Sequence, residues 1–556
     1  MEEFGKYLDD EAKKRTKPTP TPARSEAAGT KRKTMSLSSL GGVGAMFGRA
    51  KPEAAASQPK EVSTPFPKRQ RESDNLDGTG TPDPPARPIA VTRKSSLNEK
   101  LAKPTSSVAA TKVRLIGDEK LWTGKPGRAY RWMDETVENR VAAQDDQLVA
   151  LEGQVLNAVR GRSCARHALG EGDDEIAAGI VGVSSQAEVV LCGRLVCEGL
   201  EGRLNERSIL LEGTQSSRGA ARVHLNLAGC NHLAAFPGQI VGVFGRSGTG
   251  STFHARDFVA GIPPPMPEVP PPADAQTSMI VAAGPFCQRD SLDYSALEQV
   301  LEHALSAQPR VLVLCGPFVD ANNVKVSSGD TVLPGESQPR PFEEIYTEYL
   351  LPLLHRYIQP LRKKCGTEVL MVPSLDEALC FHPLPQPPLD ISLPLEARAF
   401  AQLKPLVTFL PNPAHFEING LKVSVSSTDA LSPVLREIVL RPPDRKIEEA
   451  LRLLLYQRSL FPVLPRDPPQ VSEARSEALQ FPFADLSTPD LCIFPSAVGA
   501  PTGTFVDGTA FINPGVLCKG ALGTFAEVFV LPDRAPQGGK PLPLSERARV
   551  DVMKLA

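Results

Sequence analysis

The sequence predicts an α/β plus β chain: a small antiparallel barrel followed by a layered α/β domain, preceded by a disordered N-terminal segment. Short β-rich runs separated by glycine or asparagine turns occupy about 75 residues from Gln186 onward. Beyond Ser278, apolar strands alternate with helical patterns. Before residue 111 no apolar periodicity is sustained, which is typical of disorder.

Length and composition exclude some classes of protein. The 556 residues suffice for two or three domains, with 41% hydrophobic and 23% charged residues and a formal net charge of -2. This charge gives no reason to expect nucleic-acid or membrane binding by the molecule as a whole. Because no apolar run reaches the ~18 residues that span a bilayer and no secretion signal is present, we expect a soluble intracellular protein. The ten cysteines are scattered, which favours reduced, mostly buried thiols.

Residues 1–111 are rich in Pro, Ser, Thr, Ala, Lys and Arg and poor in aromatic residues. We predict disorder, because this segment has too little apolar surface to offset the ordering entropy of the backbone. Two basic clusters are candidate nuclear-import signals, weak nucleic-acid contacts or parts of a solvated tail. They comprise Lys31, Arg32 and Lys33, and Lys68, Arg69 and Arg71. Thr64, which proline follows, is a candidate site for a proline-directed kinase.

Residues 112–185 are predicted to form a helical lead-in to the barrel. The stretch Arg128–Leu148 has apolar residues at the 3-4 spacing of one helix face, namely Tyr130, Met133, Val137 and Val141. We expect this stretch to be the first ordered helix.

Residues 186–272 are predicted to form a five-stranded barrel of OB type and its connector. The predicted strands are Glu188–Cys197, Arg207–Gly213, Arg222–Ala228 and Gln239–Gly245, with a fifth beginning near Thr252. The proline-rich stretch Gly261–Pro272 ends this unit stiffly. The aromatic residues of the predicted barrel are four phenylalanines, Phe236, Phe244, Phe253 and Phe258. They are a poor platform for stacking DNA bases, so we favour a core or protein-docking role.

One glycine-rich stretch, VGVFGRSGTGSTF from Val241 to Phe253, has nearly the spacing of a phosphate-binding loop. Gly245 and Gly250 stand at the required separation, but Ser251 occupies the position where such a loop has lysine. Without that cation the loop lacks its main attraction for phosphate. We therefore favour a hairpin between two barrel strands over an ATP site.

Residues 273–556 are predicted to form the layered α/β domain. Its predicted strands are Ser278–Gly284, Arg310–Gly316, Glu368–Ser374, Lys422–Thr428, Leu491–Ser496 and Phe525–Leu531. The predicted helices are Tyr294–Ala307, Pro341–Lys364 and Lys446–Gln457. Strands that are apolar throughout are typical of a sheet that is covered on both faces.

Ligands of layered α/β domains gather at the carboxyl ends of the strands. The residues at these ends are Gly284–Phe286, Gly316–Asp320, Pro373–Asp376, Ser427–Asp429 and Pro495–Ala497. The series resembles the calcineurin-like phosphoesterase family, whose D-x-H, G-D, G-N-H and G-H-x-H motifs at these strand ends bind two metal ions. Here G-P-F replaces D-x-H, Pro-Ser replaces N-H, and Ser-Ala-Val replaces H-x-H. The resemblance therefore implies an inactive member of that family.

Three aspartates remain at these degenerate metal positions, Asp320, Asp376 and Asp429. Two metal ions need several histidine and carboxylate ligands each, and the nearby histidines are expected in helices (His303, His355) or loops (His382, His415). We therefore predict no metal site, no cofactor and no catalytic residue. The aspartates are expected to cap helices or form turns by accepting hydrogen bonds from backbone N–H groups.

A barrel of OB type followed by such a domain resembles the B subunits of replicative DNA polymerases, and within that group the B-subunit family of DNA polymerase α-primase. The matching stretches run in the family's order from Arg128 to Leu531. They are YRWM at Tyr130, LEG at Leu211, FPGQ at Phe236, GPFVD at Gly316, VPSLDEA at Val372, PQPP at Pro385, SSTD at Ser426, QRSLFPVLP at Gln457, LCIFPS at Leu491, and NPGVLCKG with GTFAEV from Asn513 to Val528.

This resemblance implies a non-catalytic, nuclear scaffold subunit. Its partners would be the zinc-bearing C-terminal region of the catalytic polymerase subunit and the primase subunits, for primer synthesis in DNA replication. DNA contact is expected to be weak or indirect. The alternative is an active metallophosphoesterase with atypical ligands.

Overall fold

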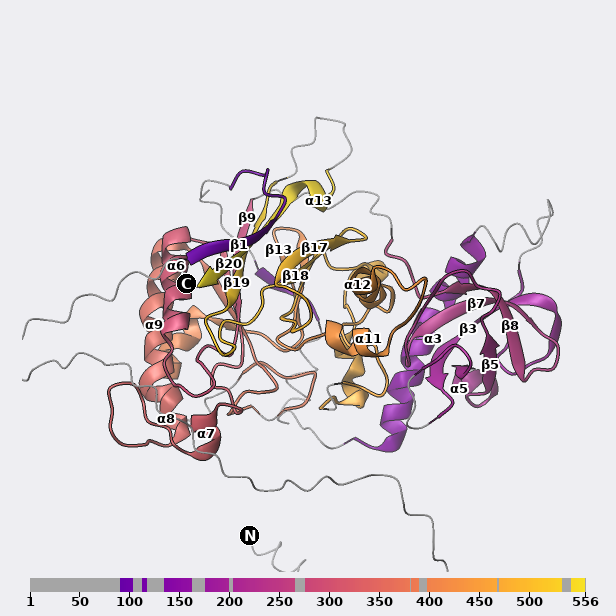
Figure 1. The fold of residues 1–556 in the computed structure, drawn as a ribbon, viewed down its shortest axis with the longest axis horizontal. Coiled ribbons are helices and arrows are strands. Elements are labelled where there is room, and N and C mark those ends of the chain that lie inside the picture. Colours follow the sequence, from indigo (N-terminus) through magenta and orange to yellow (C-terminus); the bar gives the residue numbers. More distant parts are fainter. Residues whose placement is uncertain are drawn as a thin grey trace, which may run out of the picture. The chain divides into compact units, whose positions relative to one another are not determined.

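The computed structural model describes residues 91–103, 113–117, 135–162, 176–199, 204–265, 276–380, 382–389, 398–467, 470–532 and 542–555 (Figure 1). The basic clusters and Thr64 lie outside these residues, as do Tyr130 and Met133. No helix within the described ranges is long and apolar enough to cross a membrane. The cysteines in these ranges are free thiols and most are buried, as predicted.

The OB-type barrel is confirmed as a closed five-stranded barrel in the order β3-β4-β5-β8-β7. Its elements are β3 (Ser185–Cys197), β4 (Ile209–Glu212), α5 (Gln215–Arg218), β5 (Arg222–Asn226), β7 (Ile240–Ser247) and β8 (Thr252–Val259). The long strand β3 closes the barrel because it pairs with both β4 and β7. Arg194 in β3, for example, lies opposite Glu212 in one ladder and Ile240 in the other.

The four phenylalanines of the barrel region are buried, with 0 to 4% of their surface exposed, which confirms the expected core role. Phe253 and Phe258 lie in the barrel interior. Phe244 packs under the preceding helix, and Phe236 packs into the core of the α/β domain. None of the four is available to stack on a nucleic-acid base.

The glycine-rich stretch is the hairpin between β7 and β8, as predicted, so the ATP-site interpretation is wrong. A phosphate-binding loop opens a helix, whereas here a strand begins at Thr252. The close pairing of the two strands explains Gly245, since a Cβ atom there would lie 2.1 Å from the carbonyl oxygen of His254. Gly250 has φ +81°, a left-handed conformation that the turn requires.

The lead-in helix is α3 (Val137–Gly161), which begins and ends later than predicted. Its N-cap is Thr136, whose side chain accepts a hydrogen bond from the backbone N–H of Asn139 at 3.3 Å. The predicted apolar face is wrong in the described part, because Val137 and Val141 are exposed. The face that packs on the barrel consists of Leu148, Leu151, Val155 and Val159.

The α/β domain contains two sheets. The first has the order β1-β20-β19-β9-β10-β11-β12, in which β9 to β12 are parallel and the other neighbours are antiparallel. Its strands are β1 (Val91–Leu97), β9 (Thr277–Ala283), β10 (Val311–Cys315), β11 (Glu368–Val372), β12 (Thr408–Phe409), β19 (Thr524–Val530) and β20 (Ala548–Leu555).

The second sheet has the order β17-β18-β16-β14-β13-β2. Its strands are β2 (Val113–Leu115), β13 (Ala414–Ile418), β14 (Leu421–Val425), β16 (Leu491–Ile493), β17 (Thr502–Val506) and β18 (Thr509–Asn513). A further pair, β6 (Leu233–Ala235) with β15 (Val439–Arg441), joins the barrel region to the α/β domain.

The two sheets share one aliphatic core, which includes Val281, Val313, Val423 and Leu491. The other face of the first sheet packs on α6 (Ser295–Ala307), α7 (Val324–Ser328), the continuous helical run α8 (Phe342–Glu344), η1 (Ile345–Leu350), α9 (Leu351–Pro360) and η2 (Leu361–Cys365), and α10 (Arg398–Leu403) with η3 (Lys404–Leu406). The other face of the second sheet packs on α11 (Leu431–Glu437), α12 (Lys446–Tyr456) and η4 (Glu473–Leu479). The short helices η5 (Ala484–Leu486) and α13 (Leu544–Arg547) complete the domain. The apolar strands are thus covered on both faces, as predicted, but they divide between two sheets.

Two strands lie in segments that were predicted to contain no strand at all. β1 falls inside the segment predicted to be disordered, and β2 falls inside the predicted helical lead-in. β1 is mostly polar and β2 has only three residues, and each is ordered by a partner that is distant in sequence. β1 pairs with β20, and β2 pairs with β13. Tertiary pairing therefore overrides local composition at both places.

Candidate functional site

A cavity of about 540 Å³ lies at the carboxyl ends of the parallel strands. Each of the five predicted strand-end groups contributes to the lining of this cavity. The lining residues are Gly284 and Pro285, then Gly316, Pro317 and Asp320, then Ser374 and Asp376, then Ser427 and Asp429, and finally Pro495 to Ala497. Parallel strands of one sheet end at the same edge, and the two stacked sheets bring their edges together. The sequence series therefore marks one place in the structure, which we call the strand-end cavity.

Three lysines also line the strand-end cavity, Lys94, Lys519 and Lys554. All three are exposed, and none of them forms an ion pair with a described residue. They come from β1, from the loop before β19 and from β20. Sequence reasoning missed these lysines because nothing local places those segments beside the strand ends.

Both carboxylate oxygens of Asp429 accept hydrogen bonds from neighbouring loop and helix residues. Its Oδ1 atom accepts hydrogen bonds from the backbone N–H groups of Leu431 (3.0 Å) and Ser432 (3.1 Å) at the start of α11. Its Oδ2 atom accepts from the Ser496 hydroxyl at 3.0 Å and from the backbone N–H of Ala497 at 3.1 Å. The carboxylate therefore ties the end of β14 to the end of β16, and the predicted capping role is confirmed.

Asp320 and Asp376 lie close together across Asn322. Asp320 accepts from the backbone N–H of Asn322 at 2.8 Å, as predicted for a turn residue. Asp376 instead accepts from the side-chain amide of Asn322 at 2.9 Å. Burial raises the pKa of Asp320, and the neighbouring charge of Asp376 raises it further, against the hydrogen bond from Asn322.

The loop after β9 leaves no room for the missing first ligand. A Cβ atom at Gly284 would lie 2.3 Å from the carbonyl oxygen of Pro317, in the loop after β10. The following rings, Phe286 and Phe318, stack with their centroids 5.5 Å apart. An aspartate at residue 284 would therefore force the two loops apart. The residues present do not fit a dinuclear metal centre.

The histidines do not supply the missing ligands. His303 lies in α6 and His355 in α9, as predicted, and His382 lies in a loop. The prediction for His415 is wrong, because it lies in β13, buried, with its Nδ1 atom 2.8 Å from the Ser424 hydroxyl oxygen. Burial lowers the pKa of His415 to about 3. Across the described residues, no group of three or more His, Cys, Asp and Glu side chains is placed to hold a metal ion.

Glu377 supports the loop after β10, which lines the strand-end cavity. This residue was not identified from the sequence. It is 1% exposed and accepts hydrogen bonds from the backbone N–H groups of Phe318 (2.7 Å) and Val319 (2.9 Å) and from the Tyr346 hydroxyl. Burial raises the pKa of Glu377 to about 7, although these hydrogen bonds lower it. Glu377 faces backbone groups of the β10 loop, so its contacts make it a structural residue.

The QRSLFPVLP stretch joins the barrel to the α/β domain. Gln457 accepts a hydrogen bond from the backbone N–H of Ile240 at 2.7 Å and donates to the carbonyls of Ile240 (2.9 Å) and Ala260 (2.8 Å). Arg458, 1% exposed, donates to the carbonyls of Ile262 (2.8 Å) and Pro263 (3.0 Å). Two side chains of the α/β domain thus bind the backbone at the start of β7 and just after the end of β8.

The FPGQ stretch is the counterpart of this junction on the barrel side. The backbone N–H of Leu464 donates to the carbonyl of Pro237 at 2.9 Å. A Cβ atom at Gly238 would lie 2.7 Å from the backbone nitrogen of Leu464, so only glycine permits this approach. FPGQ and QRSLFPVLP, two of the stretches that carried the family resemblance, therefore contact each other.

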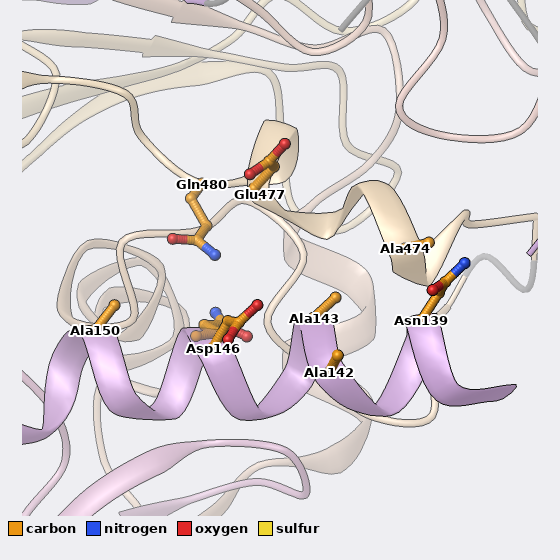
Figure 2. Close-up of a pocket in the computed structure, with 9 residues that line it drawn as sticks. Asn139, Ala142, Ala143, Asp146, Ala150, Ala474, Glu477 and Gln480 are labelled. Atoms are coloured by element: carbon orange, nitrogen blue, oxygen red, sulfur yellow. The ribbon is translucent and has the colours of Figure 1, made fainter. Parts of the chain in front are cut away.

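A second cavity, of about 460 Å³, lies between α3 and η4 (Figure 2). Its α3 side presents small residues, Ala142, Ala143 and Ala150, and its acidic groups are Asp146 and Glu477. The residues that line it include no histidine, cysteine, lysine or arginine. The lining therefore provides no nucleophile–base pair and no cation for an anionic ligand.

Comparison with known proteins gives consistent results. Two family models match: the B subunit of DNA polymerases alpha and epsilon over residues 279–502, and the OB domain of the DNA polymerase alpha B subunit over residues 164–261. The chain is 29% identical over 375 residues to the DNA polymerase alpha B subunit of Mus musculus, which covers 66% of this chain and 59% of that protein. It is 28% identical over 405 residues to the protein of the same name from Schizosaccharomyces pombe, which covers 67% of this chain and 65% of that one.

The matched region thus spans about three fifths of the length of these relatives. A crystal structure of a Thermus thermophilus protein aligns with 46% of this chain and 94% of its own, with 13% sequence identity and a TM-score of 0.21, which is too low to support an inference.

Proposed function

Since the chain belongs to the B-subunit family of DNA polymerase alpha, we propose that it is a non-catalytic scaffold subunit of DNA polymerase alpha-primase. The observation that carries this proposal is the strand-end cavity, where a metal-dependent relative would need an aspartate at residue 284 and where the backbone of Pro317 leaves no space for one. A fold can keep its architecture after its catalytic site is lost, so the fold alone does not imply phosphoesterase activity.

The proposed partners are the C-terminal region of the catalytic polymerase subunit and the primase subunits. The junction formed by Gln457 and Arg458 supports this proposal, because it holds the barrel and the α/β domain in one arrangement. A preorganised surface loses less entropy when a partner binds. The buried phenylalanines of the barrel support weak or indirect DNA contact, and the basic clusters at Lys31 and Lys68 remain the proposed signal for nuclear import.

Co-purification tests the scaffold proposal. The full chain, tagged and expressed in its own cells, should recover a large catalytic polymerase and primase in near-equal amounts. The double variant Asp320→Ala and Asp376→Ala should recover the same partners, because both aspartates contact only neighbouring loop residues. Recovery of the unmodified chain as a lone monomer would contradict the proposal.

A metal-activity assay separates the scaffold from the metallophosphoesterase alternative. We expect the full chain to show no manganese-dependent hydrolysis of p-nitrophenyl phosphate or single-stranded DNA above that of the Asp320→Ala and Asp376→Ala variant. The reason is that Asp429 already accepts five hydrogen bonds, from Leu431, Ser432, Ser496 and Ala497. In addition, residue 284 has no room for an aspartate. Manganese-dependent turnover that the double variant loses would support the alternative.

A further inference from the structure

Residues 91–103 form a strap along the edge of the first sheet. Its strand β1 is the edge strand and pairs antiparallel with β20, so that Ser96 lies opposite Asp551. The register shifts between Arg93 and Ser95, which takes Lys94 out of the ladder. Lys94 is one of the three lysines of the strand-end cavity. The strap therefore covers one sheet edge and contributes to the rim of the cavity.

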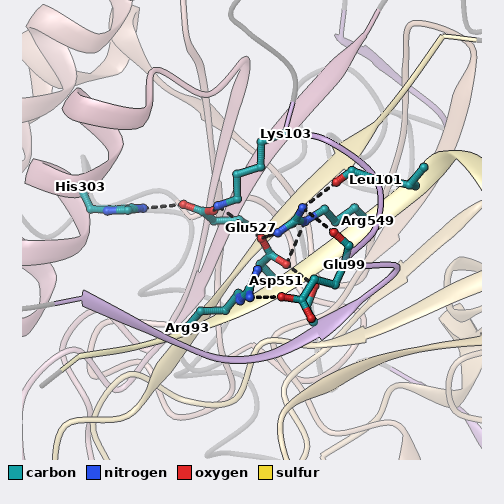
Figure 3. A network of polar contacts seen from close by, with 9 residues as sticks. Arg93, Glu99, Leu101, Lys103, His303, Glu527, Arg549 and Asp551 are labelled. Atoms are coloured by element: carbon teal, nitrogen blue, oxygen red, sulfur yellow. Dashed lines mark hydrogen bonds and ion pairs between the residues drawn. The ribbon is translucent and has the colours of Figure 1, made fainter.

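Charged groups, more than apolar burial, hold the strap in place (Figure 3). No side chain of residues 91–103 is fully buried. Lys103 lies 2.6 Å from Glu527 and 3.3 Å from Asp551, measured from Nζ to the carboxylate oxygens. Arg549 donates hydrogen bonds to the carbonyls of Leu101 at 2.6 Å and Glu99 at 3.1 Å. These contacts bind the backbone and one lysine of the strap to β19 and β20.

The carboxylates under the strap are buried and charged. Glu527 is 3% exposed and Asp551 is 0% exposed. Burial raises the pKa of each, but the partners outweigh it, so both pKa values are lowered: His303 and Lys103 act on Glu527, and Arg549, Ser96 and Lys103 act on Asp551. Two negative charges are therefore balanced by Lys103 and Arg549 alone, since His303 carries a charge only when protonated. Because Lys103 and Arg549 are already paired with these carboxylates, a further negative charge placed against Asp551 would be repelled.

A negative charge on Ser96 would repel the buried carboxylate of Asp551 more strongly than a charge elsewhere on the strap. Its hydroxyl donates to Oδ1 of Asp551 at 2.5 Å, so no atom fits between the two groups. Arg93 stands three residues before it and Lys94 two residues before it. Cations at those positions suit the acidic substrate grooves of arginine-directed serine/threonine kinases.

We infer that Ser96 is a phosphorylation site and that its modification releases the strap from the sheet edge. An ATP-dependent kinase of that class transfers the γ-phosphoryl group: the Ser96 oxygen forms a bond to phosphorus, the bond between phosphorus and the bridging oxygen of ADP breaks, and the hydroxyl proton passes to the kinase's base. The kinase acts on the strap while it is transiently open. The phosphate then prevents it from closing, because it would be forced against Asp551.

Release changes two surfaces. The edge of β20 loses its antiparallel partner and exposes unpaired backbone N–H and C=O groups, which another strand can bind. Lys94 also leaves the rim of the strand-end cavity. The inference goes beyond the scaffold role, because it concerns when these surfaces are accessible and not which partners bind them.

Hydrogen–deuterium exchange with mass spectrometry tests this inference on the full chain. After treatment with ATP and an arginine-directed kinase, phosphate should map to Ser96. Amide exchange in residues 91–103 and 548–555 should rise by about 10-fold or more, since a charge within about 4 Å of a buried carboxylate is strongly repelled. Ser96→Glu should reproduce the rise. Phosphate on Ser95 alone, or a Ser96→Glu chain with unchanged exchange, would overturn the inference.

Two variants separate charge repulsion from simple damage to the strand. Ser95→Glu places the same charge one residue away, where the Ser95 hydroxyl faces the carbonyl of Pro501 at 3.4 Å, and should raise exchange much less. In an Asp551→Asn background, which removes the repelling charge, Ser96→Glu should raise exchange by a smaller factor than in the unmodified chain. An equal rise for Ser95→Glu, or the same factor in both backgrounds, would mean that the effect is steric and would reject the inference.

Discussion

Replacing Arg458 with alanine should lower the free energy of unfolding by at least about 3 kcal/mol and should loosen the barrel from the α/β domain. The guanidinium is 1% exposed and donates to the carbonyls of Ile262, Pro263, Leu455 and Leu486. Burial lowers the pKa of Arg458 to about 10, so the group is still charged at neutral pH. Among the described residues no carboxylate forms an ion pair with it. Alanine would leave these carbonyls buried without donors.

Thermal unfolding and limited proteolysis of the purified chain measure this effect. Arg458→Ala should unfold at a clearly lower temperature, and cleavage between the barrel and the α/β domain should become faster. Arg436→Ala is the matched control, because Arg436 is 55% exposed and pairs with Asp467 at the surface. Its loss should cost no more than about 1 kcal/mol. Equal stability of the two variants would show that the Arg458 contacts do not hold the junction.

The strands that sequence reasoning predicted are those whose burial is visible in composition. β10 and β11, for example, are apolar throughout except for Glu368 at the start of β11, and their ends were predicted to within two residues. β20 was missed, although it is an interior strand of its sheet and pairs with β1 on one side and β19 on the other. It contains Arg549 and Asp551, which are both buried and form an ion pair with each other. In the sequence, two charged residues in a strand suggest that the strand is exposed. Local composition cannot reveal such a pair, because its energy depends on the fold around it.

The same limit applies to the strand-end cavity. The strand-end residues that line this cavity were predicted to lie together, because the carboxyl ends of parallel strands lie at one edge of a sheet. The lysines of its rim and Glu377 behind it were not predicted. Lys94 and Lys554 reach the cavity only because β1 and β20 add to the sheet. Glu377 follows Asp376 directly in the sequence, but one side chain is exposed and the other buried.

Replacing Glu377 with glutamine should remove a pH dependence of stability of about 3 kcal/mol between pH 4.5 and pH 7. Burial raises the pKa of Glu377 from 4.5 to about 7 in the folded chain. Below pH 4.5 Glu377 is protonated in both the folded and the unfolded chain. Burying the neutral carboxyl group costs little, so the contribution of Glu377 to the free energy of unfolding is highest there. As the pH rises from 4.5 to 7, the unfolded chain releases the proton and the folded chain retains it, so this stability is lost. Above pH 7 both states are ionised and the loss is complete.

The measurement compares thermal midpoints of the unmodified chain and of Glu377→Gln at pH 5 and pH 8. Phe318 and Val319 donate to different oxygens of Glu377, so glutamine can accept from only one of them and should cost some stability at every pH. Glutamine carries no proton that titrates, so this cost does not vary with pH. The variant should therefore gain stability relative to the unmodified chain as the pH rises. Asp376→Asn removes the exposed neighbouring carboxylate and should change the pH dependence far less, because it acts only through the pKa of Asp320. If Glu377→Gln shows the same pH dependence as the unmodified chain, the carboxyl group is ionised in the folded state throughout this range, and its three donors outweigh its burial.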